Sequence, residues 1–170
     1  YIGHGSENGL AHEGVVKTES INAWKNGTKL PLFITATCEF SRFDDGDLNI
    51  ITGVMTGKMS AGEKVLLNES GGGIALMSTT RVVYSAPNYF LNKNIYSYAF
   101  NRDASGNPLR LGDIIRLAKN ASGSGPNKRN FSLLGDPALR LAYPWNGTVV
   151  TDSINKVHVT AGTDSLKALS

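Results

Sequence analysis

The chain has 170 residues, 41% of them hydrophobic and 18% charged, with a net charge of +3. This composition is typical of one compact domain, or of one domain with the beginning of another. The basic residues are dispersed along the chain, which argues against nucleic-acid binding. No apolar run reaches the ~18 residues of a membrane-spanning helix, and a single cysteine excludes an intrachain disulfide and a multi-cysteine zinc site.

The amino-terminal part of the chain carries strand, helix and strand patterns in succession. Residues 1–2 have the pattern of a strand end. A short helix is expected over 18–24, where Thr18-Glu19-Ser20 opens it and Asn26-Gly27 closes it. The apolar run 30–37 is typical of a buried strand.

The next helix follows an irregular stretch. Ser60-Ala-Gly-Glu63 matches a capping box, in which the serine and the glutamate cap each other's backbone amides. Gly71-Gly72-Gly73 ends this helix, and residues 74–79 supply a third strand. Because strands and helices alternate, we predict a parallel sheet covered by helices, which is an α/β fold.

Apolar residues at helical spacing indicate two core-facing helices, over 88–100 and 111–120. The character of the chain changes after Pro144, where short β-branched runs are separated by turn residues. We therefore predict two domains, an α/β domain over 1–144 and the start of an all-β module over 145–170.

Two chemically active residues follow neighbouring strands of the predicted sheet. Cys38 comes directly after the strand at 30–37, and His4 follows residues 1–2 between two glycines. Parallel strands joined by one short helix are often neighbours, and their carboxyl ends then lie side by side. We expect a thiolate nucleophile and its proton carrier in one crevice, with the amides of Gly5 and Cys38 stabilising an oxyanion. The alternative is an inert buried cysteine and a loop histidine.

Other candidates carry weaker signals. Arg81 follows a strand end and either binds a substrate carboxylate or pairs with the acidic loop at 44–49. That loop lacks the glycine and the terminal glutamate of an EF-hand, so a solvated turn is favoured over a calcium site. His12 and His158 lack companions at metal-ligand spacing and are interpreted as surface histidines. We predict no metal and no cofactor.

Four segments together resemble the gingipain family of cysteine peptidases, peptidase family C25, in the clan of caspases and legumain. They are Tyr1-Ile-Gly-His-Gly-Ser6, Thr35-Ala-Thr-Cys-Glu-Phe-Ser-Arg-Phe-Asp44, the run from Gly72 to Arg81, and Leu133-Leu-Gly-Asp-Pro-Ala-Leu-Arg140. The resemblance covers about residues 1–144 and is strongest to the sortase branch that serves type IX secretion.

The resemblance implies a caspase-like α/β sandwich, with an immunoglobulin-like module after it. It puts His4 and Cys38 at the catalytic dyad and the amides of Gly5 and Cys38 at the oxyanion hole. The stretch Ser85-Ala-Pro-Asn-Tyr-Phe90 is similar to a specificity-pocket wall, so Tyr89 or Phe90 is expected to line that pocket. Glu39 stands where gingipains have a second cysteine, which argues against arginine or lysine specificity. The implied substrate-binding residues are Glu39, Arg81, Tyr89 and Phe90.

The sortase branch implies an enzyme at the cell surface and outer membrane of a Gram-negative bacterium. It would remove the carboxy-terminal signal of secreted cargo through a cysteine thioester and pass the acyl group to water or to an anchoring glycolipid. Its partners would be the cargo, the glycolipid and outer-membrane secretion components. The competing interpretation is a non-enzymatic scaffold or binding module with a relic dyad. We also expect the chain to be an excerpt of a longer protein that need not be active alone and that self-associates through its exposed strand edge.

Overall fold

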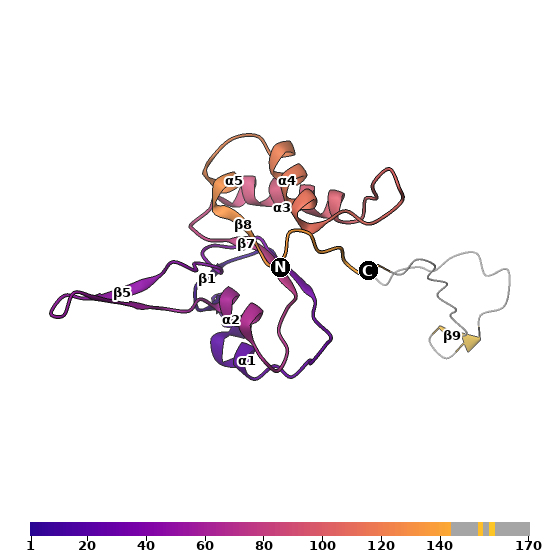
Figure 1. Cartoon of the computed structure of the whole chain (residues 1–170). Coiled ribbons are helices and arrows are strands. Elements are labelled where there is room, and N and C mark those ends of the chain that lie inside the picture. Colours follow the sequence, from indigo (N-terminus) through magenta and orange to yellow (C-terminus); the bar gives the residue numbers. More distant parts are fainter. Residues whose placement is uncertain (144–152, 155–156, 159–170) are drawn as a thin grey trace.

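The computed structural model describes residues 1–143, 153–154 and 157–158 (Figure 1). Most of the predicted all-β module at 145–170 therefore lies outside the described residues. The structure describes one antiparallel pair there, β9 (Ser153–Ile154) with β10 (Val157–His158). The domain boundary and the immunoglobulin-like character of this module stay predictions.

The central sheet has the strand order β4 (Leu32–Thr35), β7 (Ala75–Thr79), β8 (Phe131–Leu134). β4 and β7 are parallel, whereas β8 runs antiparallel to β7. A parallel bridge between Ile2 and Ala36 adds the first residues of the chain beside β4. The predicted α/β class is confirmed, but the sheet is mixed and not purely parallel, because the sequence analysis did not identify β8.

Helices cover both faces of this sheet (Figure 1). One face carries α3 (Ser85–Ala99) and α4 (Leu111–Ala121), and the short α5 (Pro126–Asn130) leads from α4 into β8. The other face carries α1 (Thr18–Asn22) and α2 (Ala61–Leu67). All four predicted helices are present. α3 begins three residues before the predicted start, with Pro87 in its first turn, where a proline costs no hydrogen bond.

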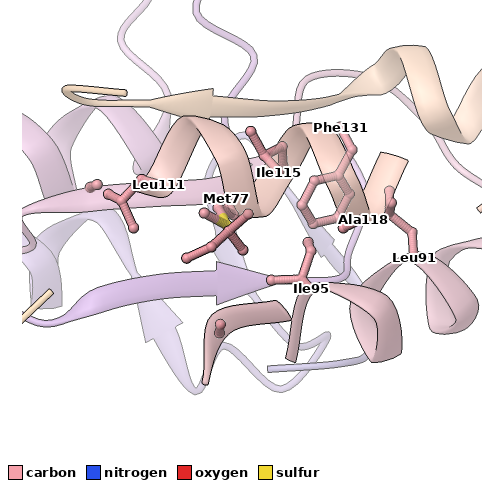
Figure 2. Close-up of a cluster of buried hydrophobic side chains, with 10 residues drawn as sticks. Met77, Leu91, Ile95, Leu111, Ile115, Ala118 and Phe131 are labelled. Carbon is pink, nitrogen blue, oxygen red and sulfur yellow. The ribbon is translucent and has the colours of Figure 1, made fainter. Parts of the chain in front are cut away.

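β7 lies between two hydrophobic clusters because successive side chains of a strand point to opposite faces. All five of its residues are buried. Met77 contributes to the cluster with α3 and α4, where it lies among Leu91, Ile95, Leu111, Ile115 and Phe131 (Figure 2). Leu76 contributes to the opposite cluster, with Ile21 of α1 and Val65 of α2. The two faces of one strand thus hold the two helical layers together.

The predicted capping box of α2 is confirmed. The Glu63 carboxylate accepts a hydrogen bond from the Ser60 amide at 2.7 Å, and the Ser60 hydroxyl accepts one from the Glu63 amide at 3.4 Å. The chain leaves the helix through Gly72, whose φ of +88° lies in the left-handed region that favours glycine. The helix therefore begins where its sequence signal lies, but it ends at Leu67, four residues before the predicted Gly71-Gly72-Gly73.

Two small antiparallel units complete the described domain. One is the sheet β1 (Gly5–Ser6), β2 (Gly9–Leu10), β3 (Val16–Lys17). The other is a hairpin of β5 (Gly46–Asn49) and β6 (Val54–Gly57), which projects away from the helices and the sheet (Figure 1). The sequence analysis described this stretch as irregular. The strands Gly-Asp-Leu-Asn and Val-Met-Thr-Gly show no regular alternation of apolar and polar residues, and the apolar pair Ile50 and Ile51 lies between them at the hairpin tip.

Tyr1 and Ile2 are exposed at the outer edge of the sheet, 42% and 54% respectively. Self-association through this edge stays a prediction. Among the described residues, no helix is long and apolar enough to span a membrane.

The burial of β7 generates a stability prediction with a matched control. Met77 is fully buried, whereas Met59 is 48% exposed. Met77→Ala should lower the free energy of unfolding by about 2–5 kcal/mol, because it removes apolar contacts and leaves a cavity between β7 and the two helices. Met59→Ala should change it by less than ~0.5 kcal/mol. Denaturant unfolding of the two variants measures the difference, and equal losses would contradict the central position of β7.

Candidate active site

His4 and Cys38 lie at equivalent positions on adjacent strand ends. Ile2 and Ala36 form the parallel bridge, and each of the two residues follows a bridged residue by two positions. The register is fixed by hydrogen bonds from the Ala36 amide to the Tyr1 carbonyl, 2.8 Å, and from the Gly3 amide to the Ala36 carbonyl, 3.2 Å. The predicted neighbour relation between these two strands is confirmed.

Both residues line one cavity of about 170 Å³. Cys38 is half-buried, and its Sγ donates to the Val83 carbonyl at 3.7 Å. His4, which also lines this cavity, is exposed. The remaining lining residues are Ile2, Gly3, Ala36, Thr37, Val83, Ser85 and Asn88. The two residues expected to share a crevice therefore line the same cavity.

Gly5 permits a close approach between the strand of His4 and the strand of Cys38. A Cβ atom at this position would lie 2.3 Å from Thr37 Oγ1, which is shorter than real contacts allow. A larger residue at this position would require Thr37 or the backbone beside it to shift. Gly5 lines the next cavity beside His4 and not the cavity that contains Cys38. The oxyanion role of the Gly5 and Cys38 amides stays a prediction.

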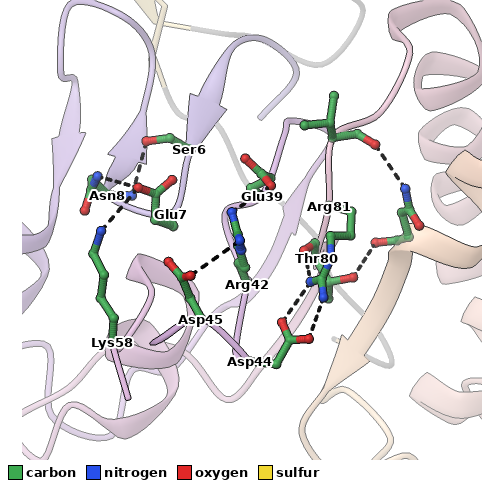
Figure 3. A network of polar contacts seen from close by, with 12 residues as sticks. Ser6, Glu7, Asn8, Glu39, Arg42, Asp44, Asp45, Lys58, Thr80 and Arg81 are labelled. Atoms are coloured by element: carbon green, nitrogen blue, oxygen red, sulfur yellow. Dashed lines mark hydrogen bonds and ion pairs between the residues drawn. The ribbon is translucent and has the colours of Figure 1, made fainter. Parts of the chain in front are cut away.

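The chain turns sharply after Cys38. Glu39 has a φ of +50°, an uncommon left-handed conformation for a residue with a side chain. Its carboxylate forms an ion pair with Arg42 at 3.2 Å, and Arg42 also contacts Asp45 at 3.4 Å (Figure 3). Glu39 thus follows Cys38 directly, but its carboxylate is paired with Arg42.

Arg81 is held by the acidic loop. Its guanidinium donates two hydrogen bonds to the Asp44 carboxylate, at 2.8 and 2.5 Å (Figure 3). The side-chain hydrogen bond from Arg81 holds the pKa of Asp44 below its usual value. Of the two alternatives for Arg81, the structure shows pairing with the acidic loop, and a substrate carboxylate would have to displace Asp44. Within the described ranges, no group of three or more metal-ligating side chains is present.

Tyr89 and Phe90 are exposed on α3, with their rings in edge contact at 5.6 Å. Neither lines the cavity of Cys38. The residues of α3 that line it are Ser85 and Asn88. A substrate contact of the two aromatic residues stays a prediction.

A family model matches nearly all of the described α/β domain. The match to peptidase family C25 covers residues 1–142. The chain belongs to peptidase family C25. No curated protein is significantly similar to it in sequence.

Solved structures agree with this membership. The Arg-specific cysteine proteinase gingipain R superposes with a TM-score of 0.65 at 17% identity, over 83% of this C25 chain and 32% of that protein. The complex of the Porphyromonas gingivalis RgpB pro- and mature domains gives 0.61 at 16% identity, over 83% and 33%. A structure described only as that of a protease gives 0.66 at 17% identity, over 82% and 34%. The predicted gingipain-like fold is confirmed, and the chain spans about a third of each of these proteins.

Sequence reasoning missed two residues of this C25 chain that line the cavities around His4 and Cys38. Asn88 is only 4% exposed, and its Oδ1 has no hydrogen-bond partner among the described residues. Asn88 lies in the first turn of α3 because this helix starts at Ser85, and not at residue 88 as predicted. Pro87 was the sequence signal for the earlier start, because proline is favoured in the first turn of a helix. His12 is exposed, as expected of a surface histidine, but it shares a second cavity with His4.

The pair of Arg81 and Asp44 generates a prediction on pH. Because the pKa of Asp44 is lowered in the folded state, the pair stabilises the fold above the unfolded pKa of about 3.9 and loses this effect as the pH falls through the folded value. Arg81→Gln should raise the pKa of Asp44 towards that unfolded value in an NMR titration.

Arg140→Gln is the matched control. Arg140 forms a comparable ion pair with Asp103 at 3.1 Å, and its loss should leave the Asp44 titration unchanged. An Asp44 pKa that is the same in the parent protein and in Arg81→Gln would show that the pair is not formed in solution.

Proposed function

We propose that the protein containing this chain is a cysteine endopeptidase in which Cys38 is the nucleophile and His4 carries the proton. The observation that supports this most directly is the shared cavity at the ends of two adjacent parallel strands. Membership of peptidase family C25 agrees with it.

The reaction requires two proton transfers at His4. The Cys38 thiolate attacks the peptide carbonyl, and backbone amides, proposed to be those of Gly5 and Cys38, stabilise the resulting oxyanion. The carbon–nitrogen bond breaks as His4 protonates the leaving amine, which leaves a thioester on Cys38. Water or an amine then attacks the thioester and gives its proton to His4, and the thiolate is released.

Substrate contacts are proposed on the α3 side of the cavity. Tyr89 and Phe90 offer exposed aromatic surface next to the turn of α3 that carries Asn88. We assign them to residues that precede the scissile bond. Glu39 and Arg81 reach a substrate only by exchanging their present partners, Arg42 and Asp44.

The finer proposal is a sortase of the type IX secretion system, because the run from Thr35 to Asp44 resembles the sortase PorU. In this role the enzyme removes the carboxy-terminal signal of secreted cargo and passes the acyl group to water or to an anchoring glycolipid. It would act at the outer membrane on the cell surface, with secretion components as partners. The cavity that holds the thiol and the imidazole together favours this over a scaffold with a relic dyad.

Kinetics of the whole protein test the dyad. Cys38→Ala and His4→Ala should each lower kcat/KM by about 10³-fold or more, and the double variant should lose no more than the larger single loss, because the two residues act as one unit. Lys25→Ala is the control, since Lys25 is exposed beside Trp24 and does not line the Cys38 cavity. Losses that multiply in the double variant would indicate that the two side chains do not act in one step.

Processing in cells tests the sortase role. A strain whose protein carries Cys38→Ala should accumulate cargo that retains its carboxy-terminal signal, and that cargo should fail to be anchored. Mass spectrometry of the cargo terminus provides the measurement. If the variant folds, reaches the surface and still processes cargo at the normal rate, the scaffold interpretation replaces the peptidase.

A further inference from the structure

His4 separates two cavities. On one side lies the cavity with Cys38, and on the other lies a larger one of about 510 Å³, lined by His4, Gly5, Ser6, Ala11 and His12. A third cavity of about 310 Å³ shares Ser6, Ala11 and His12 with the second and extends to Lys17 and Glu19. The cavities therefore form a series that starts at the thiol, passes His4 and His12, and ends at β3 and α1.

Hydrogen bonds tie the segment that carries His12 to the backbone of His4. The Ala11 amide donates to the His4 carbonyl at 2.8 Å, and the Tyr1 hydroxyl donates to the same carbonyl at 2.9 Å. Ala11 has a φ of +64°, a strained conformation for alanine that persists only where the surrounding structure holds it. The backbone at His12, the next residue, is thus held close to the backbone of His4.

The turn that starts at Ser6, which lines the cavity beside His12, is also held by hydrogen bonds. The Asn8 amide donates to the Ser6 hydroxyl at 3.2 Å, and the Asn8 side chain donates to Glu7 at 2.8 Å (Figure 3). Glu7 in turn forms an ion pair with Lys58 at 3.5 Å. Two of the residues that line the cavity beside His12, Ser6 and Ala11, therefore belong to segments held by hydrogen bonds, as is expected of a largely preformed binding site.

The proposed chemistry gives the two sides of His4 different occupants. The acyl half of the substrate stays on Cys38, whereas the leaving nitrogen must reach His4 to receive a proton. The polypeptide after the scissile bond therefore continues past His4, away from the thiol. We propose that the cavity beside His12 binds this leaving segment and, once it has departed, the amine that accepts the acyl group. This assignment rests on the proposed function.

The lining indicates which peptides fit. Gly5, Ser6 and Ala11 are small and leave room for the first residue after the scissile bond. Among the described residues the His12 ring has no hydrogen-bond partner, so both of its nitrogens are free for peptide groups. Lys17 and Glu19 at the far end have opposite charges, which gives no preference for one sign of charge. The ligand is an extended peptide of at least two residues, recognised through its backbone.

The test uses the whole protein and two substrates with the same residues before the scissile bond. One is an internally quenched peptide that continues for several residues, and the other ends in a coumarin amide. His12→Trp narrows the cavity from an exposed position, so kcat/KM on the quenched peptide should fall about tenfold or more. On the coumarin amide, whose leaving group fills only the first position after the scissile bond, kcat/KM should fall by a clearly smaller factor. With the coumarin substrate, capture of the acyl group by an added dipeptide should fall in the same variant.

Two further variants complete the experiment. His12→Ala widens the cavity and should raise the relative rate for peptides with a bulky residue directly after the scissile bond. Lys25→Trp is the control, because it adds the same ring at an exposed residue of a different cavity, which Trp24 and Phe33 also line. It should leave kcat/KM on both substrates unchanged.

The outcomes separate this inference from the proposed function. Suppose that His12→Trp and His12→Ala unfold at the same temperature as the parent protein and change kcat/KM by the same factor on both substrates. The assignment of the cavity is then wrong, while the proposed roles of Cys38 and His4 are unaffected. If Cys38→Ala cleaves the coumarin amide as fast as the parent protein does, the proposed function is wrong, and the assignment of the cavity is wrong with it.

Discussion

The burial of β7 on both faces is the constraint on which the rest of the domain depends. Its pairing with β4 brings Thr35 opposite Ser78, and the two hydroxyls share a buried hydrogen bond of 2.6 Å. One residue further, the Thr79 hydroxyl donates to the Thr37 carbonyl at 2.5 Å. These contacts fix the end of β4 immediately before Cys38. The thiol is therefore placed by a buried strand that carries no reactive group itself.

Ionic contacts stabilise the segment after the thiol, where the sheet has already ended. Asp44 and Arg81 join the loop after Cys38 to the loop after β7, and the Ser41 amide donates to the Thr79 carbonyl at 2.9 Å in the same region. The left-handed turn at Glu39 lies between these contacts and the cavity. The segment around Cys38 is thus held from two directions, by hydrogen bonds within the sheet and by ion pairs outside it.

Part of this architecture could be read from the sequence because it depends on local signals. The apolar run before Cys38 and the capping box at Ser60 predict their elements correctly, and the proximity of His4 to Cys38 needs only the strand order. β8 was missed because its apolar signal is confined to Phe131, Leu133 and Leu134, whereas the run before Cys38 extends over residues 30–37. The sequence left two alternatives for Arg81 and did not connect His12 with His4, because both depend on how loops far apart in the sequence meet.

β8, which completes the central sheet, lies far along the sequence from His4 and Cys38. His4 and Cys38 both lie within the first 38 positions, but Phe131 is part of the cluster on one face of β7, and β8 pairs with one of its edges. A nascent chain that stops before residue 131 would contain His4 and Cys38 while β7 still has an unpaired edge. During synthesis, the sheet that supports these two residues is therefore completed only after more than ninety further residues have followed the cysteine.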